Sequence, residues 1–262
     1  CDVLVIGSGA AGLSAAVVAA HAGLDVVVAE KAEVFGGTSA YSGGWLWVPN
    51  APHAVAAGFG EDPRGPKTYL RAVLGNHYDD TMIEAYLQAG PRMLEFFENN
   101  TEVHFNPGSG VPDFHGALPG AATGWRSVVA APYDGRELGQ LIGSLRPPIP
   151  ETTFLGMGIA SGVDMRMFLT ALRSPPAFLH VTRRVLKHAR DLALHRRPMQ
   201  LVNGNALIAR LLRSAADAGV ALRAGAPARA LIREGGRVTG AILESAAGPV
   251  RVAARRGVIL AA

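Results

Sequence analysis

The chain has 262 residues, of which 49% are hydrophobic and 18% are charged, and its formal net charge is +4. This length and composition allow a substantial buried core and exclude a disordered protein. The single cysteine, Cys1, excludes an intramolecular disulfide and a cysteine-based zinc site, and the dispersed histidines predict no metal site. No run reaches the ~18 uninterrupted apolar residues that a membrane span needs. We expect a cytoplasmic protein with no membrane span.

The first thirty residues predict a strand, a tight turn, a helix and a second strand. Val3–Ile6 and residues 25–29 are short apolar runs, as parallel strands buried on both faces require. Between them, apolar residues recur at helical spacing from Leu13 to Ala20. Gly23 follows where a left-handed residue would end the helix.

The turn after the first strand has the pattern G-x-G-x-x-G and reads Gly7-Ser8-Gly9-Ala10-Ala11-Gly12. Gly7 permits the tight turn, Gly9 lets a pyrophosphate approach the positive end of the helix, and Gly12 lets the helix lie close to the strand. Glu30 ends the second strand, where a carboxylate can accept hydrogen bonds from a ribose diol and would repel a ribose phosphate. A glycine-rich loop alone is weak evidence, but these elements come in order. We predict a dinucleotide site formed by the glycines and alanines of this turn and by Glu30.

A second loop rich in Gly, Ser and Thr follows Glu30 and bears on the choice between NAD and FAD. Its glycine and hydroxyl residues are Gly36, Gly37, Thr38, Ser39, Ser42, Gly43 and Gly44. A nicotinamide-binding domain would normally proceed to its next helix here, whereas this loop offers amides and hydroxyls to the longer flavin–ribityl chain. An ordinary surface loop is the alternative. We predict FAD.

Glu30-Lys31 followed by these loop residues resembles the fumarate reductase/succinate dehydrogenase flavoprotein superfamily. Within it, the segment 36–50, GGTSAYSGGWLWVPN, is similar to the ketosteroid dehydrogenase branch. The resemblance implies cofactor contacts at each of the loop residues and at Lys31. The hydroxyl residues would contact the ribityl or phosphate groups, and Gly43 and Gly44 would lie against the isoalloxazine. Members with covalent FAD carry a histidine in this loop, so its absence here implies non-covalent binding.

The last sixty residues predict a helix at 204–216 and several short strands. The strands are expected at 221–223, 228–232, 238–243, 250–252 and 257–262. Their spacing indicates a β-meander that returns to the parallel sheet. By resemblance, Ala228 lies where the family holds adenine with backbone groups, and Ala261 lies where it reads Ala-Thr-Gly-Gly. Because the chain opens and closes in apolar strands, we expect it to be part of a longer protein.

The middle of the chain contains fewer motifs. Residues 68–74 and 80–98 have helical spacing. The stretch 183–197 combines basic residues with an apolar stripe. It could be a nucleic-acid or membrane face, but a solvated helix or an inter-domain surface is favoured, and we predict no nucleic-acid partner.

Pro112-Asp113-Phe114-His115 lies where ketosteroid dehydrogenases are expected to carry tyrosine, so the hydroxyl that would line a steroid pocket is missing.

These observations predict an α/β protein: a doubly wound, Rossmann-like FAD-binding domain with a β-meander and a helical, loop-rich insertion. The domain is expected at 1–50 and 200–262, with residues 51–199 packed on it and a capping domain beyond residue 262. The resemblance implies hydride transfer between FAD and a carbon adjacent to the carbonyl of a small-molecule substrate, by desaturation or alkene reduction. No catalytic residue is assigned, and the electron acceptor is left open. The alternative is a non-catalytic flavin- or nucleotide-binding module.

Overall fold

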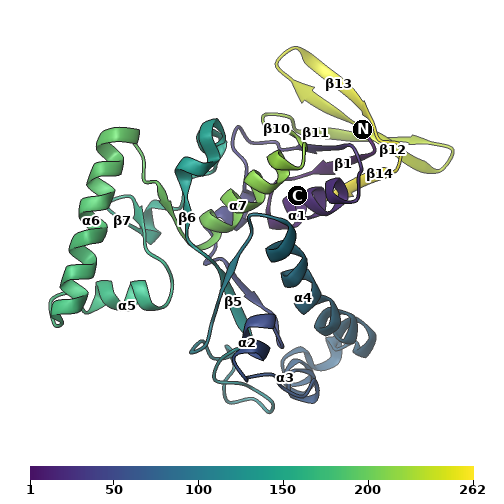
Figure 1. Cartoon of the computed structure of the whole chain (residues 1–262). Helices are drawn as coiled ribbons and strands as arrows, with labels where there is room; N and C mark the ends of the chain where they lie inside the picture. Colours follow the sequence, from purple (N-terminus) through teal and green to yellow (C-terminus); the bar gives the residue numbers. More distant parts are fainter. The chain divides into compact units, whose positions relative to one another are not determined.

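The computed structural model describes all 262 residues (Figure 1). It divides into two compact units: the larger unit contains Cys1–Gly44 and Pro132–Ala262, and the smaller unit contains Trp45–Ala131. These boundaries differ from the predicted ones, because residues 132–199 belong to the larger unit and only 45–131 form a separate body.

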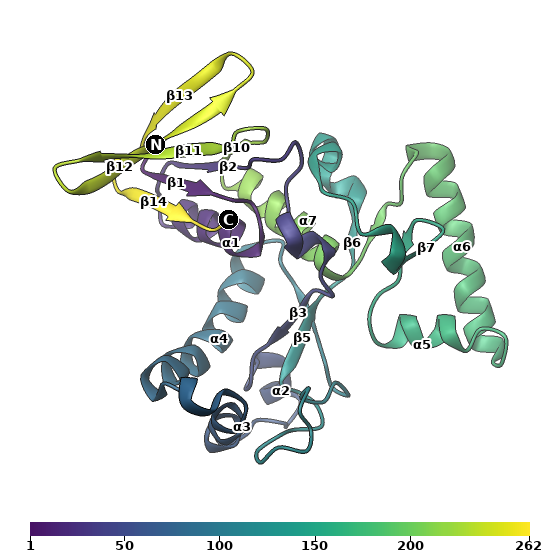
Figure 2. The same cartoon turned by 180° about the vertical axis from the view of Figure 1, so that it is seen from behind.

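A four-stranded parallel sheet forms the centre of the larger unit. Its strands, in spatial order, are β10 (Ala221–Arg223), β2 (Val26–Ala29), β1 (Val3–Ile6) and β14 (Gly257–Leu260). Val3 is paired with Val26 on one side and with Gly257 on the other. Figure 2 shows β14 beside β1, with the end of the chain following it. The order of these strands is that of a dinucleotide-binding sheet, so the predicted fold class is confirmed.

Two helices pack together beside this sheet. They are α1 (Ala10–His21), which contacts β1, β2 and β14, and α7 (Asn203–Asp217). Gly23 has a φ of 80° just after α1, the left-handed conformation predicted for it. Helix α7 contains the predicted helix at 204–216, and it is buried over most of its circumference. It is therefore a core element of the unit.

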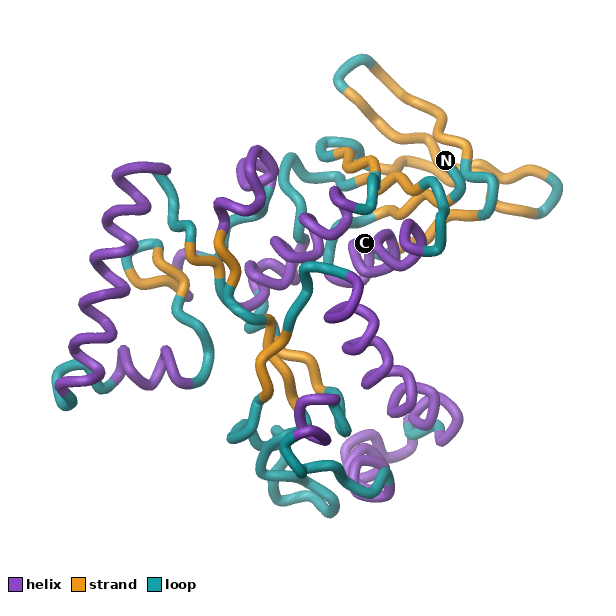
Figure 3. Tube along the Cα trace, viewed as in Figure 1, coloured by secondary structure: helices purple, strands orange, loops and turns teal.

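A three-stranded antiparallel sheet confirms the predicted meander. Its strands are β11 (Ala228–Glu234), β12 (Arg237–Ser245) and β13 (Gly248–Ala253). Alanines and leucines of this sheet and of the parallel sheet share one apolar cluster, with Leu4, Ala29, Ala241 and Leu243 among its buried members. Figure 3 shows the two hairpin turns of the meander.

The rest of the larger unit consists of short elements and two helices. The short elements are η1 (Gly37–Tyr41), β6 (Tyr133–Asp134), η3 (Gly135–Ser144), η4 (Pro150–Thr152), β7 (Thr153–Phe154), β8 (Met157–Gly158) and β9 (Gln200–Leu201). The helices are α5 (Val163–Leu169) and α6 (Pro175–His195). β6 pairs with β9, and β7 pairs with β8.

The smaller unit combines a three-stranded antiparallel sheet with helices. The sheet has the order β3 (Trp45–Trp47), β5 (Ser127–Ala130) and β4 (Phe105–Pro107). The helices are α2 (Pro52–Ala56), α3 (Arg64–Leu74), η2 (Gly75–His77) and α4 (Asp80–Asn100). Helices α3 and α4 contain the two segments whose spacing predicted them.

None of the helices is both long enough and apolar enough to cross a lipid bilayer.

Candidate functional site

The turn between β1 and α1 is built from glycines that the fold itself requires. Gly7 has a φ of 106°, and a Cβ there would lie 2.4 Å from the carbonyl oxygen of Ala261. A Cβ on Gly12 would lie 2.0 Å from the carbonyl oxygen of Gly7. Both distances are too short for any side chain, so these two glycines allow the strand, the helix and the end of β14 to meet.

Gly9 differs from these two glycines because the protein does not fill the space beside it. A Cβ there would meet only the Ser39 Oγ, at 3.4 Å, an ordinary contact distance. As the N-cap residue of α1 it offers no side chain, and the first turn of the helix contains no acidic residue. Apart from the Ala10 amide, which donates to the Ser39 Oγ, the positive end of the helix is therefore open to an anion, and the free space at Gly9 fits a pyrophosphate.

Glu30 is buried at the end of β2 and connects three segments of the chain. Its Oε2 accepts hydrogen bonds from the Ser8 backbone N–H, at 3.0 Å, and from the Ser8 hydroxyl, at 2.5 Å. Its Oε1 accepts a hydrogen bond from the Ala32 N–H, at 2.9 Å. The Ser8 hydroxyl accepts one in turn from the Gly36 N–H, at 3.0 Å. The carboxylate thus ties the first glycine loop to the second, and it retains acceptor capacity for a ribose diol.

The second glycine loop lies against the first loop and against the start of α7. The Ser39 Oγ accepts a hydrogen bond from the Ala10 N–H at 3.0 Å, the first amide of α1. A Cβ on Gly204 would lie 2.0 Å from the Ser39 carbonyl oxygen, and one on Gly44 would lie 2.5 Å from the Asn203 carbonyl carbon. This close packing brings Ser39 to the helix end at which the pyrophosphate is predicted.

The structure places every predicted cofactor residue in the larger unit. The exposed members are Ala11, Lys31, Thr38, Ser42 and Gly43. The other members of the two loops are buried or half-buried, and Gly36, with a φ of 125°, packs against Ala40 and Ile208. Ala228 is the first residue of β11. Just before it in the chain, the Ala226 N–H donates to the Glu30 carbonyl oxygen at 2.8 Å. Ala261 follows β14 and donates from its N–H to the Ile6 carbonyl oxygen at 2.8 Å.

A cavity of about 650 Å³ lies beside the second loop, within the larger unit. Its walls include Tyr41 and Ser42 from that loop, Leu201 and Asn203 before α7, and several residues of the segment 147–158. A ligand that continued along the loop past Ser42 would reach this space.

Two residues of this region were not predicted from the sequence. Ser8 is a variable position of the glycine motif, and only its contacts reveal that it joins Glu30 to Gly36. Asn203 has a φ of 57°, and its side chain holds the segment before α5 by accepting from the Ser161 N–H at 3.0 Å and donating to the Ile159 carbonyl at 2.8 Å. An Asn-Gly pair at a helix start is a signal for such a conformation.

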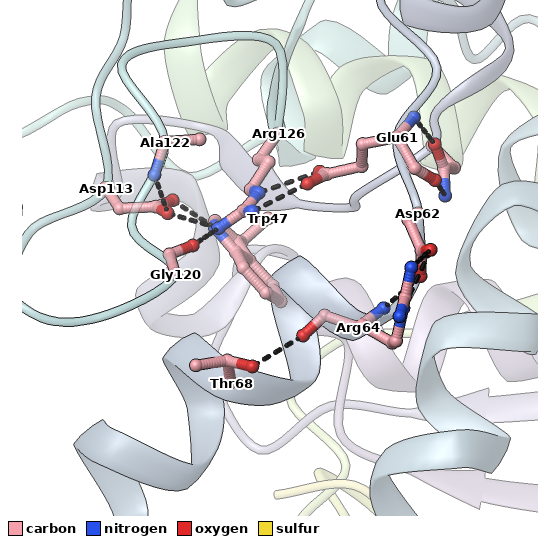
Figure 4. Close-up of polar contacts among 10 residues, drawn as sticks. Trp47, Glu61, Asp62, Arg64, Thr68, Asp113, Gly120, Ala122 and Arg126 are labelled. Carbon is pink, nitrogen blue, oxygen red and sulfur yellow. Dashed lines mark hydrogen bonds and ion pairs between the residues drawn. The ribbon is translucent and has the colours of Figure 1, made fainter.

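In the smaller unit, a buried ion network holds the loop that contains Phe114 and His115. The Arg126 guanidinium donates to both oxygens of Glu61, at 2.7 and 2.6 Å, and to Asp113 Oδ2 at 2.7 Å (Figure 4). Asp113 also accepts from the Trp47 indole N–H at 2.6 Å. Burial acts to lower the pKa of Arg126, but its hydrogen bonds and ion pairs with the two carboxylates outweigh this and leave the pKa raised.

The result is a fixed loop with an outward-pointing tip. Asp113 is only 6% exposed, whereas the adjacent Phe114 is 99% exposed. The backbone N–H of His115 donates to the Tyr69 hydroxyl at 3.2 Å, so the chain is held on both sides of Phe114. His115 itself is exposed and lies in the smaller unit, and it belongs to no group of histidines, cysteines or acids that could hold a metal.

The parallel sheet, the open helix end and the two joined glycine loops define a class of protein, the flavoproteins built on a dinucleotide-binding fold. The family model described as "FAD binding domain" matches residues 2–262. The chain belongs to this family, and the prediction that it binds FAD is confirmed.

Comparison with known proteins also confirms the resemblance to the ketosteroid dehydrogenase branch. The chain is 40% identical over its whole length to the 4-oxocyclohex-2-ene-1-carboxylate 5-dehydrogenase of Sinomonas cyclohexanicum, of which it covers 44%. Over 99% of its length it is 35% identical to a 3-oxosteroid 1-dehydrogenase of Mycobacterium tuberculosis, of which it covers 46%. The chain thus spans about half the length of the curated relatives it matches.

A solved structure supports the same relationship. The chain matches the crystal structure of 3-ketosteroid delta1-dehydrogenase from Sterolibacterium denitrificans, in complex with 1,4-androstadiene-3,17-dione, with a TM-score of 0.88 and 32% identity. The match covers 100% of this chain and 47% of that chain.

The two kinds of glycine should respond differently to the same substitution. We expect Gly9→Ala to fold normally but to lose FAD, because the added methyl group would occupy the space of the pyrophosphate. Gly12→Ala should instead lower the free energy of unfolding by about 1–3 kcal/mol, since its Cβ would meet backbone. Gly110→Ala, with no atom within 4 Å, is the matched control. Flavin absorbance and circular dichroism of the purified protein measure both effects, and full flavin content in Gly9→Ala would contradict the phosphate assignment.

The role of Glu30 can be tested with Glu30→Gln, because Glu30→Ala would leave the buried donors of Ser8 without an acceptor. We expect FAD affinity to fall about tenfold or more, since hydrogen bonds from the ribose to a charged acceptor contribute roughly 1.5–3 kcal/mol each. Ser8→Ala is the control: it breaks the link to Gly36 but keeps the carboxylate. Fluorescence titration with FAD compares the two variants. An equal loss of affinity in both would mean that Glu30 acts only by holding the loops together.

The network around Arg126 should stabilise the smaller unit. We expect Asp113→Asn to lower the free energy of unfolding by roughly 1.5–3 kcal/mol, the contribution of a hydrogen bond to a charged group. Asp62→Asn, which breaks the exposed pair with Arg64 shown in Figure 4, should cost about 0–1 kcal/mol. Tryptophan fluorescence during denaturation reports on this unit, because it contains all three tryptophans: Trp45, Trp47 and Trp125. Equal stability losses in the two variants would contradict a structural role of the buried pair.

Proposed function

We propose that the full-length protein is an FAD-dependent oxidoreductase that transfers a hydride between the flavin and a ring carbon adjacent to a carbonyl group. The observation that carries the proposal is the junction of the two glycine loops at the start of α1, where Ser39 binds the Ala10 amide and Gly9 leaves its space open. Such a junction suits a long dinucleotide with a pyrophosphate at its centre. All the relatives described above are named as dehydrogenases of oxo compounds, which favours an enzyme over a non-catalytic module.

In this proposal each part of the larger unit has a defined task. The amides at the start of α1 bind the pyrophosphate, and Glu30 accepts hydrogen bonds from the adenosine ribose. Thr38, Ser39 and Ser42 bind the ribityl or phosphate groups, Gly43 and Gly44 lie against the ring system, and Ala228 holds the adenine. Bound FAD supplies the hydride chemistry, and the protein positions it and controls its surroundings. The group that moves the α proton is not assigned to any residue of this chain.

The favoured substrate is a small cyclic ketone. The relative with 40% identity is named for a cyclohexene carboxylate that carries an oxo group. Phe114 provides an apolar tip without a hydroxyl where the steroid branch is expected to have tyrosine, and the fixed loop described above presents it to its surroundings. We infer that ketosteroids are poor substrates.

Anaerobic mixing of the full-length protein with candidate substrates tests this function. We expect 4-oxocyclohex-2-ene-1-carboxylate to bleach the visible absorbance of the oxidised flavin. Cyclohex-2-ene-1-carboxylate is the control, because it lacks the carbonyl that acidifies the α carbon and should leave the flavin oxidised. A ketosteroid should react with kcat/KM below ~10⁴ M⁻¹s⁻¹, the lower edge of ordinary enzyme efficiency. Failure of a broad panel of cyclic ketones to reduce the flavin, or to reoxidise it once reduced, would contradict the proposal.

A further inference from the structure

The cavity of about 650 Å³ beside the second glycine loop has one charged residue in its wall. That residue is Arg197, in the turn between α6 and β9. Most of the remaining wall is apolar, and its larger apolar members are Leu145, Pro147, Pro148, Pro150, Leu155 and Leu201. The volume lies within the ~300–1,000 Å³ that small-molecule sites usually have. The space suits a small, largely apolar ligand that carries an anionic group.

The Arg197 guanidinium has no anionic partner in the protein. Its Nη1 donates to the Ile142 carbonyl oxygen, and its buried Nε has no hydrogen-bond partner. No Asp or Glu belongs to the cavity wall. Burial lowers the pKa of Arg197, and no neighbouring charge opposes this effect. A half-buried cation of this kind gains free energy from a ligand that supplies the missing counter-ion.

The hydroxyl of Tyr41 provides a second donor in the same wall. Arg146 Nη1 donates to this hydroxyl at 3.0 Å, and the Arg146 guanidinium carbon lies 5.5 Å from the centre of the Tyr41 ring. Because the hydroxyl accepts this hydrogen bond, it keeps its own proton for donation. Asn205 Nδ2 holds Arg146 in turn, by donating to its carbonyl oxygen at 2.7 Å. The wall thus contains a guanidinium and a hydroxyl that can both donate to an anionic ligand.

The cavity adjoins the residues that are predicted to bind the flavin. Ser42, predicted to contact the ribityl or phosphate groups, is part of the wall together with Tyr41. Gly43 and Gly44, which are predicted to lie against the ring system, follow Ser42 directly in the chain. A ligand in the cavity could therefore place one end near these residues and the other end near Arg197.

We propose that the cavity binds the carboxylate of a cyclic keto acid, with Arg197 as the residue that recognises the acid group and Tyr41 as a second donor. A carboxylate replaces the water around the guanidinium and accepts charge-assisted hydrogen bonds from it. A neutral ring ketone such as a ketosteroid would cover the guanidinium without supplying an anion, which costs free energy. The proposal rests on the function proposed above and adds the property by which the protein selects its substrate, a negative charge.

Isothermal titration calorimetry of the full-length, FAD-loaded protein tests the carboxylate site separately from the reaction. The probes are cyclohexanecarboxylate and its neutral counterpart cyclohexanecarboxamide, neither of which has a carbonyl group in the ring. We expect the acid to bind about tenfold or more tightly than the amide, because hydrogen bonds to charged groups contribute more than neutral ones. Equal affinities, or no binding of the acid, would overturn the proposal.

Three variants assign the preference for the acid to Arg197. Arg197→Gln should weaken binding of the acid about tenfold or more and leave binding of the amide unchanged. Arg197→Lys should keep part of the preference, because it retains the charge but not the planar fork of donors. Arg196→Gln removes the same charge from the adjacent, exposed residue, so it is the matched control and should bind like the parent protein. Circular dichroism and flavin content confirm that each variant is folded. A preference that survives in Arg197→Gln, or is lost equally in Arg196→Gln, would contradict the assignment.

Flavin reduction distinguishes this proposal from the proposed function. In the parent protein the KM for 4-oxocyclohex-2-ene-1-carboxylate should lie about tenfold or more below that for neutral cyclohex-2-en-1-one, and Arg197→Gln should remove the difference. If neither compound reduced the flavin while the acid probe still bound through Arg197, the proposed function would be wrong and the carboxylate site would stand. If both compounds reduced it with the same KM, the function would stand and the carboxylate site would be overturned.

Discussion

The larger unit depends on one buried carboxylate. A charge out of contact with water is tolerated only where hydrogen bonds replace its hydration, and Glu30 obtains them from Ser8 and Ala32. Because Ser8 also accepts from the Gly36 amide, this requirement joins the end of β2 to both glycine loops. The second loop is thereby held where Ser39 reaches the first amide of α1. The hydrogen bonds that the buried Glu30 carboxylate requires therefore largely organise the cofactor site.

The fold could be predicted from the sequence to a large extent because its signals are local. Apolar runs, helical spacing and the glycine turn predicted β1, α1 and β2, and the close spacing of several short strands predicted the meander. The unit boundaries could not be predicted, because they depend on distant pairings such as Tyr133 with Leu201. The two glycine loops of the site were predicted. The hydrogen bonds by which Ser8 connects them through Glu30 and Gly36 were not predicted, because any residue type fits that position of the G-x-G-x-x-G motif.

The exposed side of α6 shows a limit of sequence patterns of another kind. Residues 183–197 combine basic residues with an apolar stripe, a pattern compatible with a solvated helix, an inter-domain surface, or a nucleic-acid or membrane face. Periodicity reveals that a helix has two sides but not which side faces inward. The contacts of Arg184 and His188 decide the orientation, and only the folded structure contains them.

The chain leaves the larger unit at Gly44 and returns to it at Pro132, and this has a consequence for synthesis on the ribosome. The smaller unit is continuous, so all of its residues have been made once residue 131 has emerged. Strand β1 can pair with β2 early, but its other edge pairs with Gly257–Leu260 and stays open until these late residues have been made. Contacts between such distant residues form slowly. During that interval the first apolar strands of this chain have an unpaired edge, which exposes the nascent chain to wrong pairing.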